Sequence, residues 1–163
     1  MLSANLHDVE INHISVIEHP QANQSHSHSL FFTGDQVLHN ITFTNSIGFT
    51  GRYGAHPMAF GPGMCVTNQP ATYTELIEKC WKPGVFKANV LVGDPKTAGD
   101  PKKWPAGNQF VANVSAVGFK GDYSLADDSP FKGAGTDGRD PGPDIPRLLA
   151  AIDGVEAGVS PTA

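Results

Sequence analysis

Charged residues are scarce in this chain. They make up 17% of its 163 residues, against about 25% in an average globular domain. Those that are present give no basic excess, because the formal net charge is -5. We therefore exclude a nucleic-acid backbone as a partner, since binding one requires a basic patch or stripe. An acidic polysaccharide is also repelled by the average surface, although a local basic patch could still bind it.

Long apolar runs are lacking too. No stretch approaches the roughly 20 apolar residues of a membrane-spanning helix, so we expect no membrane partner. The first residues, Met1 to Leu6, have neither the basic start nor the apolar stretch of a secretory signal peptide. Taken alone, the sequence predicts a protein that stays inside the cell. If the chain is part of a longer exported protein, we expect an extracellular or periplasmic location.

Cysteine is rare as well. Cys65 and Cys80 lie 15 residues apart, and the chain has 2 cysteines. A cysteine-based zinc site would need more ligands at closer spacing. Two interpretations remain, a disulfide formed in an oxidising compartment or two small buried apolar side chains.

Glycine and proline are abundant, at 18 and 13 residues, which favours strands and turns over long helices. Three segments, 9–17, 41–49 and 85–93, alternate apolar and polar residues as half-buried strands do. Each has an asparagine near its middle: Asn12, Asn45 and Asn89. This recurrence indicates an internal repeat with loops of unequal length.

A parallel β-helix accounts for this pattern. Each coil stacks on the next at about 4.8 Å, so equivalent apolar side chains form a continuous core. Buried asparagines at equivalent bends can bond to one another as a ladder. We therefore expect Asn12, Asn45 and Asn89 to occupy matching structural positions.

Further elements follow from local signals. We expect strands over 29–33 and 111–119. A capping box of Thr72 and Glu75 predicts a short helix ended by Pro83. Asp144 is the predicted N-cap of a last helix, with an apolar face of Leu148, Leu149, Ile152 and Val155. Trp104 is expected to hold the polar loop 94–108 against the body.

The segment 122–145 carries a resemblance. Its sequence, DYSLADDSPFKGAGTDGRDPGPDI, resembles the closing motif of bacterial right-handed parallel β-helix proteins, which are similar in fold to pectate lyases. Upstream stretches at 88–93, 104–108 and 116–119 look like the coils that precede this motif. The resemblance covers about residues 8–149. The motif is fairly specific for architecture but says little about activity, because the fold hosts lyases, hydrolases, epimerases and binding proteins.

The resemblance implies an all-β fold: a partial right-handed parallel β-helix of about three to four coils with one or two short capping helices. We expect a single domain over 7–157, with coils over 7–119 and a closing cap over 120–157, and a disordered tail over 158–163. Family members run to several hundred residues, so we expect N-terminal coils to be missing here. The open N-terminal end then predicts a homo-oligomer.

Two basic residues are candidates for catalysis. Lyases of this fold need a cation to neutralise a uronate carboxylate and a base to abstract the adjacent proton. Lys87 and Arg52 are the candidates, although an outward lysine on a sheet is usually only solvated. The sequence contains no His-Glu-x-x-His, Gly-x-Ser-x-Gly or glycine-rich phosphate motif.

Candidate metal ligands fall in two places. His26 and His28, at i and i+2 with His13 nearby, could hold a transition metal. Asp137 and Asp140 could hold calcium through carboxylate oxygens. An Asp-Gly turn and a helix cap explain the second segment more simply.

We weighed three functions. The leading hypothesis is a C-terminal structural portion of a β-helix protein that contacts carbohydrate through Tyr53, Phe60 and Trp104 and has no complete active site. The alternative is a polysaccharide lyase or glycoside hydrolase acting on an acidic polysaccharide. A third, weaker alternative is a phage or cell-surface adhesin.

Overall fold

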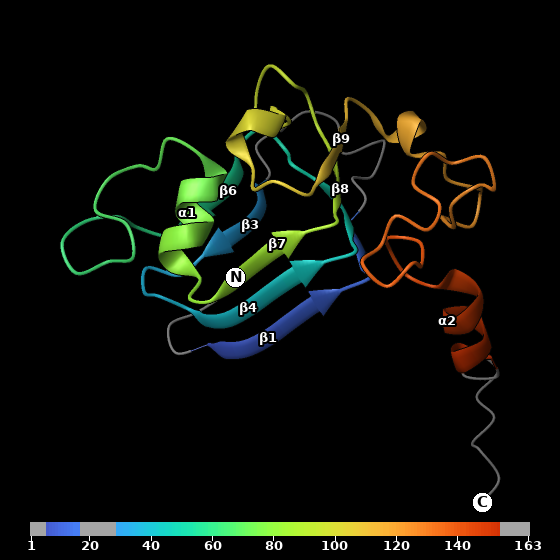
Figure 1. Ribbon diagram of the computed structural model, residues 1–163, viewed down its shortest axis with the longest axis horizontal. Coiled ribbons are helices and arrows are strands. Elements are labelled where there is room, and N and C mark those ends of the chain that lie inside the picture. Colours follow the sequence, from blue (N-terminus) through green and yellow to red (C-terminus); the bar gives the residue numbers. More distant parts are fainter. Residues whose placement is uncertain (1–5, 17–28, 154–163) are drawn as a thin grey trace, which may run out of the picture.

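The computed structural model describes residues 6–16 and 29–153 (Figure 1). These residues are mostly β-structure with two short α-helices. The strands are β1 (His7–Asn12), β2 (Ser15–Val16), β3 (Ser29–Thr33), β4 (His39–Thr44), β5 (Ile47–Phe49), β6 (Gly54–Pro57), β7 (Gly84–Lys87), β8 (Val90–Val92) and β9 (Gln109–Val111). The helices are α1 (Tyr73–Cys80) and α2 (Ile145–Ile152).

The strands form three parallel sheets. Sheet A has the order β1-β4-β7, sheet B has the order β2-β5-β8-β9, and sheet C pairs β3 with β6. Every one of these pairings is parallel. The chain therefore passes through sheets A, B and C in one circuit, repeats that circuit, and then adds β7, β8 and β9. Figure 1 shows β1, β4 and β7 lying one above another.

The in-register pairing aligns equivalent side chains. Ile11 lies opposite Phe43, and Phe43 lies opposite Phe86. The rings of Phe43 and Phe86 stack with their centroids 5.2 Å apart. Neighbouring parallel strands lie about 4.8 Å apart, which brings same-face side chains into contact. The interior of the sheets is therefore an aromatic stack that runs from one circuit to the next.

Trp104 extends this stack. Its ring lies 5.3 Å from that of Phe86, and only 3% of the residue is exposed. Its Nε1 donates a hydrogen bond to the carbonyl oxygen of Ala98 at 2.7 Å. Trp104 thus fastens the loop 94–108 to the core. The prediction that it contacts carbohydrate is wrong, because a buried indole offers no stacking face.

Helix α1 begins as the capping box predicts. Thr72 Oγ1 accepts a hydrogen bond from the backbone N–H of Glu75 at 3.1 Å. Glu75 reaches back to accept from the N–H of Ala71 at 2.9 Å. Leu76, Ile77 and Cys80 are buried on its inner face, which packs against β6 and β7.

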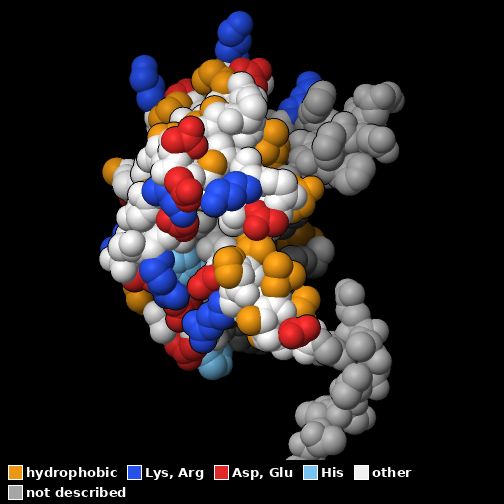
Figure 2. All heavy atoms as spheres, turned by 90° about the vertical axis from the view of Figure 1, so that its right-hand side faces the viewer, with side chains coloured by type: hydrophobic (Ala, Val, Ile, Leu, Met, Phe, Trp, Pro, Cys, Tyr) orange, Lys and Arg blue, Asp and Glu red, His pale blue; other side chains and the backbone are white. Residues whose placement is uncertain are grey.

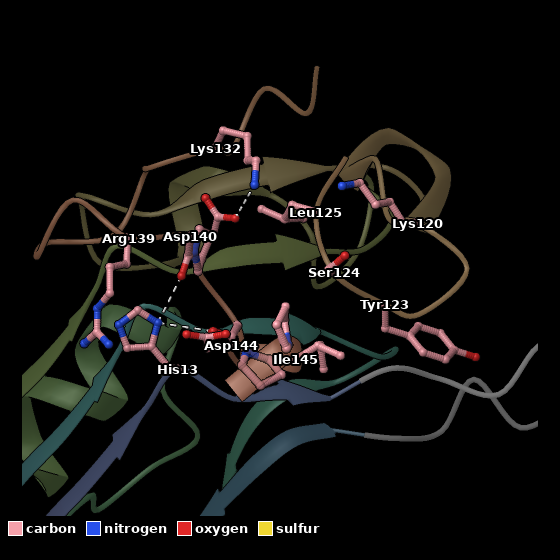
Figure 3. A pocket seen from close by; sticks show the side chains of 14 residues that line it. His13, Lys120, Tyr123, Ser124, Leu125, Lys132, Arg139, Asp140, Asp144 and Ile145 are labelled. Atoms are coloured by element: carbon pink, nitrogen blue, oxygen red, sulfur yellow. Dashed lines mark hydrogen bonds and ion pairs between the residues drawn. The ribbon is translucent and has the colours of Figure 1, made fainter. Parts of the chain in front are cut away.

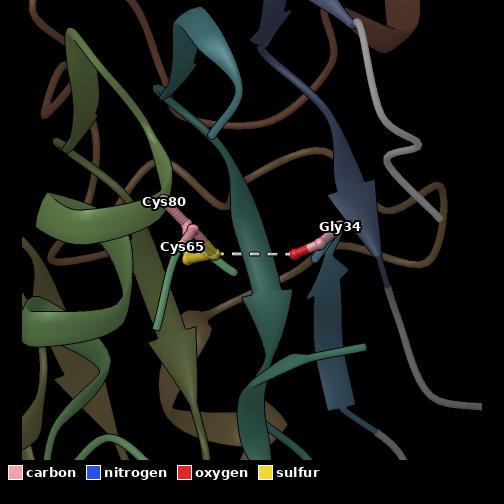
Figure 4. The surroundings of a disulfide bond; sticks show 3 residues. All are labelled: Gly34, Cys65 and Cys80. Carbon is pink, nitrogen blue, oxygen red and sulfur yellow. Dashed lines mark hydrogen bonds between the residues drawn. A yellow bond between two sulfur atoms is a disulfide. The ribbon is translucent and has the colours of Figure 1, made fainter. Parts of the chain in front are cut away.

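A disulfide joins Cys65 to Cys80 and ties the loop after β6 to the end of α1. The Cys65 sulfur lies 3.7 Å from the carbonyl oxygen of Gly34 (Figure 4). The Cys65 N–H donates to the carbonyl of Asp35 at 2.8 Å. The disulfide and this backbone hydrogen bond together connect three segments: the loop after β3, the loop after β6, and α1.

The cap, residues 113–153, follows β9. The prediction of a strand over 111–119 is wrong beyond Val111, because Asn113 caps a 3-10 turn (Val114–Val117) by accepting from the N–H of Ala116 at 3.1 Å. A second core forms here from Val117, Leu125 and Phe131 with residues of β5 and β8. Helix α2 starts at Asp144, whose side chain accepts from the Arg147 N–H at 3.1 Å. Over the described ranges, no helix is long and apolar enough to cross a membrane.

Candidate functional site

The turn between sheets A and B is where the cap meets the circuits. His13, Asn45 and Ala88 follow aligned positions of β1, β4 and β7, and all three have left-handed backbone conformations, with φ of 51°, 53° and 55°. We call this turn, with the residue before and after each of the three, the corner. Such φ values are uncommon outside glycine and favour asparagine.

The three predicted asparagines all lie in the corner, but not at matching positions. Asn12 precedes the left-handed residue, Asn45 is that residue, and Asn89 follows it. The predicted single ladder is therefore wrong. Asn45 Nδ2 donates to Asn12 Oδ1 at 2.9 Å, whereas Asn89 Nδ2 donates to Asn108 Oδ1 at 3.0 Å. The alternating pattern misaligned the third segment by one residue, and it gave no signal for Asn108.

Asn45 connects the second circuit to the cap. Its Oδ1 accepts from the backbone N–H of Thr136 at 2.8 Å, and its carbonyl accepts from the N–H of Gly142 at 2.8 Å. Gly142 has φ of 86°, and a Cβ there would lie 2.6 Å from Ser15 Oγ. The cap thus approaches β2, next to the corner, so closely that glycine is required there.

His13 connects the first circuit to the cap. Its Nε2 lies 3.0 Å from Asp137 Oδ2. Its Nδ1 lies 3.0 Å from the carbonyl of Asp140 and 3.2 Å from that of Gly142. One imidazole therefore contacts three cap residues that are more than 120 positions away in the chain.

The cap carboxylates are occupied by nearby donors. The Arg139 backbone N–H, its guanidinium and His13 hold the pKa of Asp137 far below its usual range. Although burial raises the pKa of Asp140, hydrogen bonds from Lys132 and the Gly133 N–H lower it on balance. The Lys132–Asp140 ion pair measures 2.7 Å.

One predicted metal site lies within the described residues and the other does not. The described ranges, 6–16 and 29–153, contain no group of three or more His, Cys, Asp or Glu side chains that could hold a metal ion. The carboxylates of Asp137 and Asp140 bind protein donors, so calcium is not supported there. His26 and His28 lie outside the described residues.

A cavity of about 440 Å³ opens in the cap (Figure 3). Its cations are Lys120, Lys132 and Arg139, and each is paired with a cap carboxylate, at 3.3 Å, 2.7 Å and 2.6 Å. Figure 3 shows Lys132 reaching Asp140, with the Tyr123 ring turned away. These pairs hold the cap together, which leaves little charge for a ligand.

A larger groove of about 670 Å³ lies beside sheet B. It is lined by the apolar side chains Phe49, Val92 and Val114 and by the polar side chains Arg52, Asp94, Thr97 and Asn113. Phe49 and Val92 are neighbours in the β5–β8 ladder. The groove combines a cation, a carboxylate and neutral hydrogen-bonding side chains, which suits a polar ligand with one apolar face.

The other predicted site residues lie unequally around this groove. Arg52 lines it, and its guanidinium carbon lies 5.6 Å from the ring centre of Tyr53, which is 42% exposed but does not line the groove. Phe60 is 52% exposed but does not line it. Lys87 is exposed at the end of β7 and does not line it either. The two candidate catalytic residues are therefore not brought into one groove.

Sequence reasoning missed Asp94, Thr97 and Asn113 as groove residues. All three lie in loops without periodicity, and each already makes a local backbone contact that explains it. Comparison with protein families, with curated proteins and with solved structures finds no match for this chain.

Proposed function

We propose that this chain forms the C-terminal coils and closing cap of a right-handed parallel β-helix. In this proposal its role is structural, it contacts carbohydrate, and it has no complete active site. Each circuit through sheets A, B and C corresponds to one coil, and residues 113–153 form the cap.

The observation that carries the proposal is the repeated sheet order. Two successive circuits pass through sheets A, B and C, and a third resumes with β7 and β8, all with parallel pairing. No single circuit could bury its apolar face alone, since Phe43 is covered by Phe86 on the next circuit. Stacked coils are the simplest architecture with these pairings.

The cap supports a structural role. It covers β8 and β9 with Val117, Leu125 and Phe131, and its ion pairs satisfy one another rather than facing a ligand. An exposed strand edge invites pairing with other chains, so covering it protects a β-helix from association at that end.

The groove at Arg52 supports the carbohydrate contact. A guanidinium can bind a sugar carboxylate through two parallel hydrogen bonds. The Tyr53 ring lies outside the groove and against this guanidinium, where it supports the Arg52 side chain. The ligand class that fits is therefore an acidic polysaccharide, held by a local cation despite the net negative charge.

The fold part is tested by solution NMR of the intact chain. We expect backbone contacts between Val9 and Ile41, between Ile41 and Gly84, and between Val90 and Gln109, the partners of the parallel ladders. Antiparallel contact patterns would overturn the β-helix.

The carbohydrate part is tested by calorimetry with polygalacturonate and with a neutral glucan. We expect binding of the acidic polymer alone, weakened at least about tenfold by Arg52→Ala, the loss of one charge-assisted contact. Arg147→Ala, which removes an exposed arginine of α2, is the matched control and should bind normally. Binding unaffected by Arg52→Ala would contradict the proposal.

The lyase alternative has a separate readout. A lyase forms a carbon–carbon double bond in the product, which absorbs ultraviolet light. Double-bond formation that is lost on Arg52→Ala or Lys87→Ala would replace the structural proposal with the enzymatic one, because each change removes only one cation.

A further inference from the structure

The groove beside sheet B lies at the carboxyl ends of three neighbouring parallel strands, β5, β8 and β9. Their last paired residues are Phe49, Val92 and Val111. Two positions further along each strand come Gly51, Asp94 and Asn113, and all three line the groove. Because parallel strands end at the same edge of a sheet, these residues form a row with steps of about 4.8 Å. Gly51 has no side chain, so the row leaves space next to Asp94.

Asp94 has one carboxylate oxygen available to a ligand. Its Oδ1 accepts a hydrogen bond from the backbone N–H of Lys96 at 2.8 Å, which fixes the side chain. Its Oδ2 makes no hydrogen bond with any residue that the structure describes. The residue is exposed at the groove. An oriented carboxylate oxygen of this kind is an acceptor for a hydroxyl group.

Asn113 offers a donor instead. Its Oδ1 accepts from the backbone N–H of Ala116 at 3.1 Å and from the hydroxyl of Ser115 at 2.6 Å. These two bonds hold the amide oxygen toward the 3-10 turn, so Nδ2 is the atom that faces away from it. Within residues 6–16 and 29–153, no acceptor binds this Nδ2. An acceptor and a donor therefore occupy neighbouring positions of the row.

We propose that Asp94 and Asn113 bind two adjacent hydroxyl groups of a uronate ring whose carboxylate is held by Arg52. Asp94 accepts a hydrogen bond from one hydroxyl, and Asn113 donates one to the oxygen of the other. This rests on the acidic polysaccharide proposed above and adds the part of the sugar that is recognised.

The order of the strands suits the shape of such a sugar. In polygalacturonate the carboxylate is on C5 of each ring, and the free hydroxyls are on C2 and C3, across the ring. Arg52 follows β5, whereas Asp94 and Asn113 follow β8 and β9, which lie further along the stack. The cation and the hydroxyl-binding pair therefore come from successive levels of the stack, as the two sides of one ring require.

Charge makes the hydroxyl contacts decisive. The Arg52 guanidinium contacts the Tyr53 ring and forms no ion pair with the described part of the chain, so it can take a carboxylate. Asp94 adds a negative charge to the same groove, which disfavours ligands that offer anionic groups alone. Figure 2 shows basic and acidic side chains next to one another on the face that carries the cap, and such interspersed charges attract an acidic polymer only weakly.

Calorimetry with two forms of polygalacturonate tests the proposal. Periodate cleaves the bond between the two hydroxyl-bearing carbons, and borohydride reduces the resulting aldehydes. The opened polymer keeps its carboxylates but has no adjacent ring hydroxyls. We expect the unchanged chain to bind the intact polymer at least about tenfold more tightly, the effect of one hydrogen bond to a charged group. Ring opening also loosens the polymer, but that effect is the same for every variant of the chain.

Asp94→Asn is the decisive variant, and Asp100→Asn is its matched control. Both aspartates precede a proline and accept from the N–H two residues further on, but Asp100 does not line the groove. We expect Asp94→Asn to lose most of the preference for the intact polymer and Asp100→Asn to keep it. An equal preference in the two variants would overturn the proposal, because the shared local turn would then account for Asp94.

Asn113→Asp tests the second contact. The change keeps an oxygen for the N–H of Ala116 and removes the amide donor. The added charge repels the carboxylates of both polymers alike, so the readout is the preference between them. We expect this preference to fall at least about threefold, the effect of one neutral hydrogen bond. An unchanged preference would contradict the role of Asn113.

The possible results distinguish the hydroxyl contacts from the proposed function. Binding that is lost on Arg52→Ala but is equal for the intact and the opened polymer would overturn the hydroxyl contacts and leave the acidic polysaccharide standing. No binding of intact polygalacturonate would overturn both. Thermal melts show whether each variant keeps the fold, and the comparison of the two polymers on the unchanged chain needs no variant.

Discussion

The imidazole Nε2 of His13 and the carboxylate Oδ2 of Asp137 lie 3.0 Å apart, although 124 residues separate them along the chain. His13 stands at the corner of the first circuit, and Asp137 belongs to the cap. The contact therefore joins the first circuit to the cap, two parts of the fold that are far apart in the sequence. It also places a carboxylate whose protonation depends on pH at the junction between two parts of the fold.

Asp137 should make stability depend on pH in the acid range. Hydrogen bonds from Arg139 and His13 lower its pKa in the folded chain, so the folded chain binds the proton less readily than the unfolded chain does. The stability it contributes is present above the unfolded pKa of 3.8 and is lost as pH falls through the lower folded value.

We therefore expect Asp137→Asn to be less stable than the unchanged chain at neutral pH, with the difference shrinking in acid. Urea titrations at a series of pH values measure this. Asp128→Asn, a change of an exposed aspartate in the same cap, should show no such trend. A gap between the two chains that stays constant with pH would contradict the expected role of Asp137.

Asn45→Gly tests the junction between the second circuit and the cap. Glycine tolerates the left-handed backbone, so the change removes the side-chain bonds to Asn12 and Thr136 without adding strain. We expect a loss of about 1–3 kcal/mol, because at least two side-chain hydrogen bonds of Asn45, a residue that is only 3% exposed, are removed.

The control for this change is Asn40→Gly. Asn40 has φ of 55° but is exposed, so its loss should cost less than about 1 kcal/mol. Chemical denaturation of both variants gives the comparison. Equal losses for the two would mean that the corner bonds of Asn45 add nothing beyond an exposed asparagine.

Reduction of the Cys65–Cys80 disulfide should lower the free energy of unfolding. The bond closes a 15-residue loop, for which the loop-closure entropy of the unfolded chain amounts to about 3 kcal/mol. Calorimetry of Cys65→Ala/Cys80→Ala measures the change. Reductant should shift the unaltered chain in the same direction and leave the double variant unchanged.

Trp104→Ala should be far more disruptive than Phe60→Ala. The buried indole contacts Phe86 and donates to Ala98, so its removal should cost about 3–5 kcal/mol. Phe60 is 52% exposed, and its loss should stay within about 0.5 kcal/mol. Thermal melting curves of the two variants measure the difference. A loss of stability for Phe60→Ala as large as that for Trp104→Ala would show that the loop of Phe60 is packed.

Much of the fold could be predicted because its signals are local. Alternation marks β1, β4 and β7, and the capping residues Thr72 and Asp144 mark the starts of α1 and α2. These signals span only a few residues, since a strand or a helix end is specified by its immediate neighbours. The mostly parallel β-structure with two short helices follows from them.

The candidate site was harder to predict because the strand register determines which side chains meet. In the observed strand register, Asn12, Asn45 and Asn89 are each offset by one residue from the next, so they occupy different positions in the corner. The side chain of Asn89 therefore bonds to Asn108 and not to Asn45. Similarly, Trp104 in a polar loop looks like a surface aromatic until the chain folds it onto Phe86.

The sequence by itself therefore determined the elements: short parallel strands, two capped helices, and a closing segment rich in glycine and aspartate. Only the tertiary structure decided the partners, such as His13 with Asp137, Asn45 with Thr136, and Arg52 with Asp94 in one groove. The physical reason is distance along the chain. Contacts between residues about 40 to 130 positions apart leave no local pattern, and they form only when stacked circuits and the returning cap bring them together.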